Sequence, residues 1–138
     1  MSQPTAQRGE GPDEQHIRRL VGSLFRAENG NPAEGDLEAG DILAPDYLPI
    51  TRAKGQVDAS REDTVGRIAN PAGSLTRHVD RAAIDVSLFM DDRVAIARTL
   101  LPTTDGASGA EASYRNMHVF LKREDGWKCV AWQVTRVQ

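Results

Sequence analysis

The sequence predicts one α+β domain in which helices come first and a meander of long antiparallel strands follows. Apolar residues of the first half recur at the helical period, whereas the second half, from Gly73 onward, alternates apolar and polar residues as strands do. The length of 138 residues is that of a single domain. We therefore expect residues 12–138 to form one domain, after a disordered tail over residues 1–11 that is rich in Gly, Pro, Gln and Ser.

The first predicted helix covers residues 13–29. Asp13 is a suitable N-cap, and Asn29-Gly30 is a typical helix end. Its apolar residues follow the i, i+3, i+4, i+7, i+8 spacing of one helix face, which we expect to be buried: Ile17, Leu20, Val21, Leu24 and Phe25.

Two further helices are expected before the sheet. Residues 31–43 begin with Asn-Pro, an N-cap followed by proline at the first helical position, and predict a short helix. Residues 47–52 predict a short edge strand. The third helix, over residues 60–70, begins at Ser60, with Asp63 in the reciprocal position of a capping box.

Period-two alternation predicts four long strands in the second half. A turn at residues 90–93 joins the first two, and Asp125-Gly126 supplies a two-residue hairpin turn between the last two. The expected strands cover residues 78–89, 94–101, 112–123 and 127–137.

Composition narrows the classes of function. The net charge of −3, without any Lys/Arg cluster, disfavours nucleic-acid binding, and no apolar run is long enough to span a membrane, so we expect a cytoplasmic protein. Cys129 is the only cysteine, which excludes an intrachain disulfide or a cysteine-based zinc site. The chain has no phosphate-binding glycine loop, no metal-ligand spacing and no Gly-x-Ser-x-Gly elbow, so we expect a cofactor-free pocket without metal.

The stretches DVSLFMDDRVAIARTLL and YRNMHVFLKREDGWKCVAWQVTRV resemble the SnoaL-like (DUF4440-type) branch of the NTF2-like superfamily. The resemblance covers roughly residues 14–137, and its most specific parts are the Asp-Gly turn followed at once by Trp127 and the Val134-Thr135-Arg136 ending. The chain departs from the usual turn at Glu124 and in having nothing between Gly126 and Trp127.

This resemblance implies an NTF2-like (cystatin-like) cone, in which a strongly curved, mostly antiparallel sheet wraps around the N-terminal helices and leaves a pocket between them. It also implies a homodimer that forms through the outer sheet face. Members of the superfamily include isomerases, dehydratases, polyketide cyclases and epoxide hydrolases, and others are non-catalytic binding or oligomerisation domains. The resembling motif is structural, so it predicts the fold better than an activity.

If Asp125-Gly126 is the turn, the strand register follows. Val119 is then opposite Trp132 and Met117 opposite Val134, on the more apolar face of the hairpin. We expect this face to line the pocket, while His118 and Gln133 lie on the outer face. The expected ligand contacts of the hairpin are Arg115, Met117, Val119 and Trp132.

His78 and Asp80 are the candidate catalytic residues. They continue the apolar stripe of Ala82, Ile84, Val86 and Leu88, and being two residues apart on a strand they point the same way. An imidazole and a carboxylate together could abstract and return a proton, with burial raising the carboxylate pKa. The alternative is that both belong to an exposed strand end.

Arg98 and Tyr47 complete the predicted site. Arg98 interrupts the apolar face of Val94, Ile96 and Leu100, where a guanidinium needs an anionic ligand group or a carboxylate such as Asp80. Tyr47 could donate a hydrogen bond to an oxyanion, or be a core tyrosine.

These observations predict a protein that binds a small apolar organic molecule and acts on it as a cofactor-independent isomerase, dehydratase or cyclase by acid/base chemistry. The alternative is a non-catalytic ligand-binding or oligomerisation module, in which the interior polar residues only pair with one another. A third hypothesis is a protein-interaction domain that uses an outer patch around His118, Phe120 and Gln133.

Overall fold

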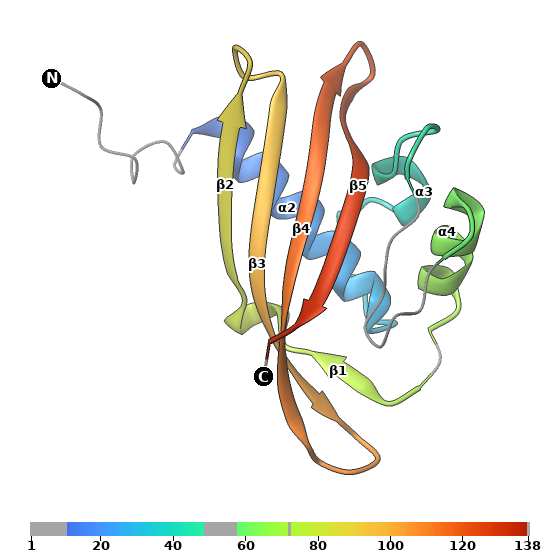
Figure 1. Ribbon diagram of the computed structural model, residues 1–138. Helices are drawn as coiled ribbons and strands as arrows, with labels where there is room; N and C mark the ends of the chain where they lie inside the picture. Colours follow the sequence, from blue (N-terminus) through green and yellow to red (C-terminus); the bar gives the residue numbers. More distant parts are fainter. Residues whose placement is uncertain (1–10, 49–57, 72, 138) are drawn as a thin grey trace, which may run out of the picture.

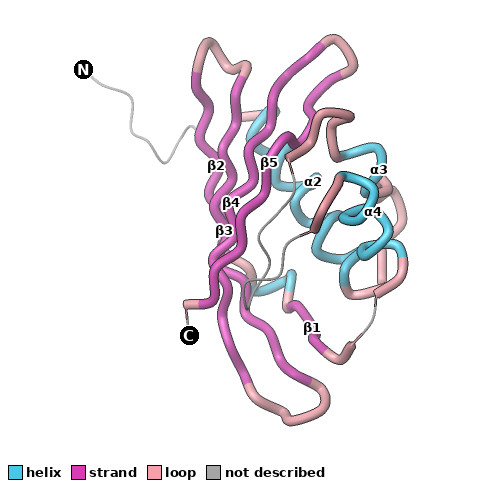
Figure 2. Tube along the Cα trace, turned by 45° about the vertical axis from the view of Figure 1, so that its right-hand side comes forward, coloured by secondary structure: helices cyan, strands magenta, loops and turns pink. Residues whose placement is uncertain are grey.

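A computed structural model describes residues 11–48, 58–71 and 73–137 of the chain. The described helices cover one side of a strongly curled antiparallel sheet, and α2 crosses its concave face (Figure 1). Figure 2 shows the same layers from the side, with α2, α3 and α4 on one side of β2 to β5. The elements are α2 (Pro12–Glu28), α3 (Ala39–Ile42), α4 (Arg61–Ala69), β1 (Leu75–Arg77), η2 (Val79–Arg81), β2 (Ala83–Phe89), β3 (Val94–Asp105), β4 (Glu111–Arg123) and β5 (Gly126–Arg136).

Strand β3 lies inside the sheet and pairs along both of its edges. One of its edges pairs with β2 through its first half and with β1 through its last residues, from Thr103 to Asp105. The other edge pairs with β4, which pairs in turn with β5. All these pairings are antiparallel. The predicted α+β class with a curved, mostly antiparallel sheet is therefore confirmed.

Helix α2 supplies the centre of the core. Its predicted apolar stripe is buried against the concave face of the sheet, where Val86, Ala97, Phe120 and Trp132 are also buried. The helix begins one residue earlier than expected, because Pro12 occupies the first turn and Gly11, rather than Asp13, is the N-cap. Asp13 instead accepts a hydrogen bond from Trp127 Nε1 at 3.2 Å.

The segment after α2 is less helical than predicted. Only Ala39–Ile42 form a helix, and no helix forms over residues 31–38. The Asp36 carboxylate holds this loop on α2, because it accepts hydrogen bonds from Arg26, from Ser23 and from the Ala33 N–H. Gly35, with φ +89°, is incompatible with a continuous helix. In the expected strand over residues 47–52, Tyr47 and Leu48 are not in a strand, and residues 49–52 lie outside the described residues.

Helix α4 begins as predicted. The Ser60 hydroxyl accepts a hydrogen bond from the Asp63 N–H at 3.1 Å, and the Asp63 carboxylate caps Ala59 rather than Ser60. Arg61 ties this helix to the end of α3, donating to the carbonyls of Gly40, Leu43 and Ala44. Together these bonds hold α4 beside the concave face.

The turn predicted for the closing hairpin is misplaced by one residue. Arg123 pairs with Gly126, so Glu124 and Asp125 form the two-residue loop. The face of β4 that was predicted to line the pocket is also wrong, because the even-numbered residues of β4 face the core. His118 is therefore fully buried instead of facing outward.

A β-bulge near Val130 explains why Trp132 is nonetheless inside, as predicted. The register shifts between Val119 and Phe120, where Phe120 pairs with Cys129 but Val119 pairs with Ala131. The extra residue in β5 reverses its alternation. Consequently Trp127 and Cys129 before the bulge and Trp132 after it are all buried.

The first predicted long strand is interrupted. The 3-10 turn η2 separates β1 from β2, so His78 and Asp80 do not continue the buried stripe of Ile84, Val86 and Leu88. The inward direction of those three apolar residues is as predicted, because β2 itself alternates without a break. The expectation that His78 and Asp80 share their face in a strand is wrong.

Candidate functional site

A ladder of ion pairs crosses the space between α2, α4 and β1. Arg77 Nε lies 3.2 Å from Glu28 Oε1, and Glu28 Oε2 lies 2.8 Å from Arg67 Nη1. Arg67 Nε in turn donates to Asp58 Oδ2 at 3.2 Å. Both carboxylate side chains are only 7% exposed. Two guanidinium groups and two carboxylates therefore form a nearly buried network without net charge.

Asp58 also holds the side chain of Thr64, on α4, in place. Its Oδ2 accepts a hydrogen bond from the Thr64 hydroxyl at 3.0 Å. The pKa of Arg67 is raised despite burial, because Glu28 and Asp58 stabilise its positive charge. Arg67 is thus a permanent cation held in a fixed direction by two carboxylates.

An aromatic and amide cluster continues from the ladder into the core. The Arg67 guanidinium lies 5.9 Å from the centroid of the Trp132 ring, and Trp132 Nε1 donates to Asn116 Oδ1 at 2.8 Å. The His118 ring lies 4.6 Å from the Trp132 ring and 5.6 Å from that of Phe25. Polar groups on β4, β5 and α4 therefore meet apolar rings on the concave face.

Several buried polar atoms of this region have no hydrogen-bond partner among the described residues. A buried donor or acceptor left unpaired costs about 1–3 kcal/mol, so such atoms mark places where another polar group is needed. The atoms are the Tyr47 hydroxyl, Arg67 Nη2, the Thr99 hydroxyl and both ring nitrogens of His118.

Two of these groups have strongly altered acidity. Burial lowers the pKa of His118 to about 3, so its imidazole is neutral at physiological pH. Burial also raises the pKa of the Tyr47 hydroxyl, which lies close to Thr64, Asp58 and Arg67 without forming a well-directed hydrogen bond. Both groups therefore offer neutral hydrogen-bonding atoms inside the fold.

The structure separates the residues that the sequence predicted as ligand contacts. Tyr47 and Trp132 are buried on the concave side. Arg98, Arg115, Met117 and Val119 lie on the opposite, outer face of the sheet, because β3 buries its odd-numbered residues and β4 its even-numbered ones. The expectation that these four face the pocket is wrong. The Arg98 side chain is 63% exposed and lies 3.9 Å from Asp85, not from Asp80.

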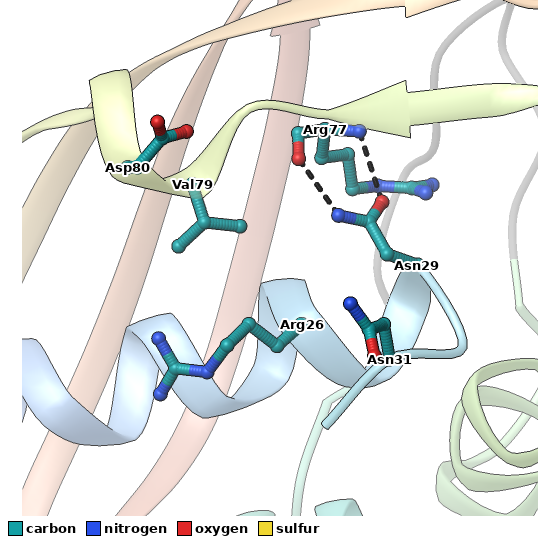
Figure 3. A pocket seen from close by; sticks show the side chains of 6 residues that line it. All are labelled: Arg26, Asn29, Asn31, Arg77, Val79 and Asp80. Carbon is teal, nitrogen blue, oxygen red and sulfur yellow. Dashed lines mark hydrogen bonds between the residues drawn. The ribbon is translucent and has the colours of Figure 1, made fainter. Parts of the chain in front are cut away.

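His78 and Asp80 lie at the end of the helical layer instead. His78 Nε2 is 2.8 Å from the Thr104 hydroxyl, and its backbone N–H donates to the Pro102 carbonyl. Asp80 lines an open cleft of about 320 Å³ between the end of α2 and the β1–η2 segment (Figure 3). The other lining residues are Arg26, Asn29, Asn31, Arg77 and Val79.

The side chains of this cleft do not converge on one point. In Figure 3 the guanidinium groups of Arg26 and Arg77 point in opposite directions, and Asp80 points away from α2. Arg26 is held by Asp36 and Arg77 by Glu28. Asn29 closes one end, where its amide exchanges two hydrogen bonds with the Arg77 backbone at 2.7 and 2.9 Å. The cleft therefore lacks a concentrated charge for ligand recognition.

Arg67, Glu28 and Asp58 were missed by the sequence reasoning. Glu28 continues the spacing of the apolar stripe of α2, four residues after Leu24, and Arg67 lies between the buried Thr64 and Ile68 of α4. Charged residues at buried helix positions were the available signal for an internal ion pair.

No group of three His, Cys, Asp or Glu side chains within the described ranges could hold a metal ion. In the same ranges, no helix combines the length and the apolar character needed to cross a bilayer.

The architecture is that of the NTF2-like, or cystatin-like, fold. An uncharacterised cystatin-like protein from Caulobacter vibrioides superposes with a TM-score of 0.69 at 16% identity, over 93% of this chain and 92% of that one. A proposed dehydratase of the NTF2-like family from Streptomyces avermitilis gives 0.63 at 14%, over 91% and 97%. The CaMKII hub of S. rosetta gives 0.63 at 15%, over 92% and 98%.

These identities establish a shared fold and no shared activity. No protein-family model matches the chain, and none of the curated proteins matches it by sequence.

Proposed function

We propose that this protein binds a small organic molecule on the concave side of the sheet, beside Tyr47, Arg67, Thr99 and His118. The observation that carries the proposal is the set of unpartnered polar atoms of these residues in an otherwise well-paired interior. Specific sites combine apolar walls with a few fixed polar groups. Here Phe25, Phe120 and Trp132 supply apolar surface close to His118.

Binding is better supported than proton transfer. The buried carboxylates Glu28 and Asp58 are each held in ion pairs with Arg67, and neither ring nitrogen of His118 has a hydrogen-bond partner among the described residues. A catalytic role of His78 and Asp80, as in an isomerase, dehydratase or cyclase, is a separate proposal, because both residues lie in the β1–η2 segment. Membership of the SnoaL-like branch is likewise proposed, on the strength of the hairpin motif.

Native mass spectrometry tests the binding proposal. The purified protein, incubated with a small-molecule extract of its expression host, should carry a non-covalent adduct that denaturation releases. Thr99→Val removes one unpartnered hydroxyl with little change of shape and should weaken adduct formation, whereas Thr135→Val, on an exposed residue of β5, should not. Equal adduct levels in both variants, or no adduct in either, would contradict the proposal.

Self-association through the outer sheet face is a second proposed function. Cross-strand pairs of apolar residues, Ile96 with Val119 and Val94 with Leu121, lie side by side on this face. Met117 next to them is 41% exposed. A contiguous apolar surface of this kind is typical of protein interfaces, and one structure of the same fold is a hub domain.

The patch predicted earlier for a protein partner needs correction, because His118 and Phe120 are buried and only Gln133 is exposed. Light scattering coupled to size-exclusion chromatography tests the corrected face. A homodimer is expected for the native chain, and Val119→Glu should yield a monomer. A monomeric native chain would refute this second function.

A further inference from the structure

The unpartnered atoms near α4 also indicate which chemical group a ligand presents there. Arg67 uses Nε and Nη1 on Asp58 and Glu28, and only Nη2 lacks an acceptor in the described part of the chain. The Tyr47 hydroxyl lies close to Arg67, Asp58 and Thr64 and is likewise unpartnered. Asp58 thus lies beside both donors, and both donors require an acceptor.

The direction of the Arg67 guanidinium is fixed. Two carboxylates hold it at one edge, and the Trp132 ring lies against it at 5.9 Å. Nη2 therefore cannot rotate toward solvent without breaking the ion pairs. A hydrogen-bond acceptor for Nη2 therefore has to approach this fixed position.

The ion-pair ladder has no net charge, so a neutral acceptor fits it better than an anionic one. The positive charges of Arg67 and Arg77 are already compensated by Glu28 and Asp58. A ligand carboxylate would add a buried charge without a counter-charge, which is unfavourable. A carbonyl oxygen accepts two hydrogen bonds and carries no net charge.

We propose that the ligand is a small neutral carbonyl compound, a ketone, ester, lactone or amide, whose oxygen accepts hydrogen bonds from Arg67 Nη2 and the Tyr47 hydroxyl. This inference rests on the proposed binding function. Arg67 and Tyr47 are the anchor of the carbonyl group, and the Trp132 ring beside Arg67 supplies apolar surface for the rest of the ligand.

Three probes of equal ring size test the anchor: cyclohexanone, cyclohexanecarboxylate and cyclohexylammonium. Binding is followed by the indole N–H resonance of Trp132 in two-dimensional NMR, assigned with a Trp127→Phe variant. Cyclohexanone should shift this resonance saturably, and the two charged probes should not. Equal or tighter binding of the carboxylate would overturn the inference.

Tyr47→Phe is the decisive variant, because it removes an unpartnered hydroxyl and keeps the ring. It should weaken cyclohexanone binding by about tenfold, the value of one hydrogen bond. Tyr114→Phe, on β4, is the matched control and should bind like the native chain. Unchanged binding in Tyr47→Phe would overturn the inference.

The two proposals can fail separately. If native mass spectrometry detects an adduct but cyclohexanone does not bind, the carbonyl inference fails and the binding function stands. If neither an adduct nor probe binding is detected, both fail.

Discussion

The Asp36 carboxylate should make the stability of the fold depend on pH in a specific acidic range. Its pKa is lowered from an ordinary 3.8 to about 2, first by the hydrogen bonds from Arg26 and then by those from the Ala33 N–H and Ser23. Because the folded-state pKa lies below the unfolded one, this stabilisation is complete above pH 3.8. It is lost as the pH falls through about 2.

The magnitude follows from the two pKa values. A decrease from 3.8 to about 2 corresponds to about 2.4 kcal/mol at neutral pH. The Asp36 side chain is 9% exposed, but that of Arg26 is 32% exposed, so solvent screens the pair and about 1–2 kcal/mol is a better expectation. Asp36→Asn should lower the free energy of unfolding by this amount at pH 7.

Urea denaturation of the native chain and of Asp36→Asn, from pH 7 down to the lowest pH at which both fold, provides the assay. The difference between the two should be constant above pH 5, about one unit above the unfolded pKa of 3.8, and should shrink as the pH falls below about 4. A difference that does not change with pH would refute the electrostatic reasoning.

The exposed ion pair of Asp46 and Arg123 is the control. It also consists of two hydrogen bonds from one guanidinium to one carboxylate, at 2.7 and 2.9 Å, but lies in solvent. Exposed pairs contribute little. Asp46→Asn should therefore leave the stability unchanged, and a loss as large as that of Asp36→Asn would show that burial is not the deciding factor.

Three further predictions concern single residues. Because the pKa of His118 is lowered from 6.5 to about 3, the free energy of unfolding should fall by about 5 kcal/mol as the pH drops through this range, and His118→Phe should flatten this pH dependence in urea unfolding; an unchanged slope would contradict its burial. Met90 has φ +55° in the β2–β3 turn, so Met90→Gly should raise the free energy of unfolding, measured by thermal unfolding, by up to about 1 kcal/mol; a decrease would argue against backbone strain there. Burial raises the pKa of the Cys129 thiol to about 12, so iodoacetamide should label it only after denaturation, as mass spectrometry can check; rapid labelling of the folded protein would refute this.

The fold could be predicted where the sequence pattern had a single interpretation. The stripe of α2 and the alternation of Ile84, Val86 and Leu88 each leave one apolar face, so their inward direction followed directly. Strand β4 does not, since both of its faces carry apolar residues, such as Val119 on one and Phe120 on the other. With apolar residues on both faces, the alternation did not decide which face meets the core, and the odd-numbered face was predicted although the even-numbered one is buried.

The candidate site was harder to predict because it depends on contacts between distant segments. Glu28 and Arg67 are 39 residues apart, and nothing local in either helix requires the pair. The bulge near Val130 likewise could not be predicted from local sequence, because it is defined only by the pairing of β4 with β5. Trp132 was predicted to face the pocket from its place in the closing hairpin and Tyr47 as a ligand contact or core residue, whereas their polar neighbours could be found only from the packed structure.

The position of Arg67 shows how binding and folding are coupled in this protein. Its guanidinium is buried only because Glu28 on α2 and Asp58 before α4 compensate its charge. Replacing either carboxylate would leave the network of Arg67 and Arg77 with an excess positive charge and would weaken the α2–α4 contact together with any ligand site. Variants of the ladder therefore cannot separate the two roles. Tyr47 and Thr99 can, because each contributes an unpartnered hydroxyl on which the fold does not depend, and a binding defect in those variants would report on the ligand alone.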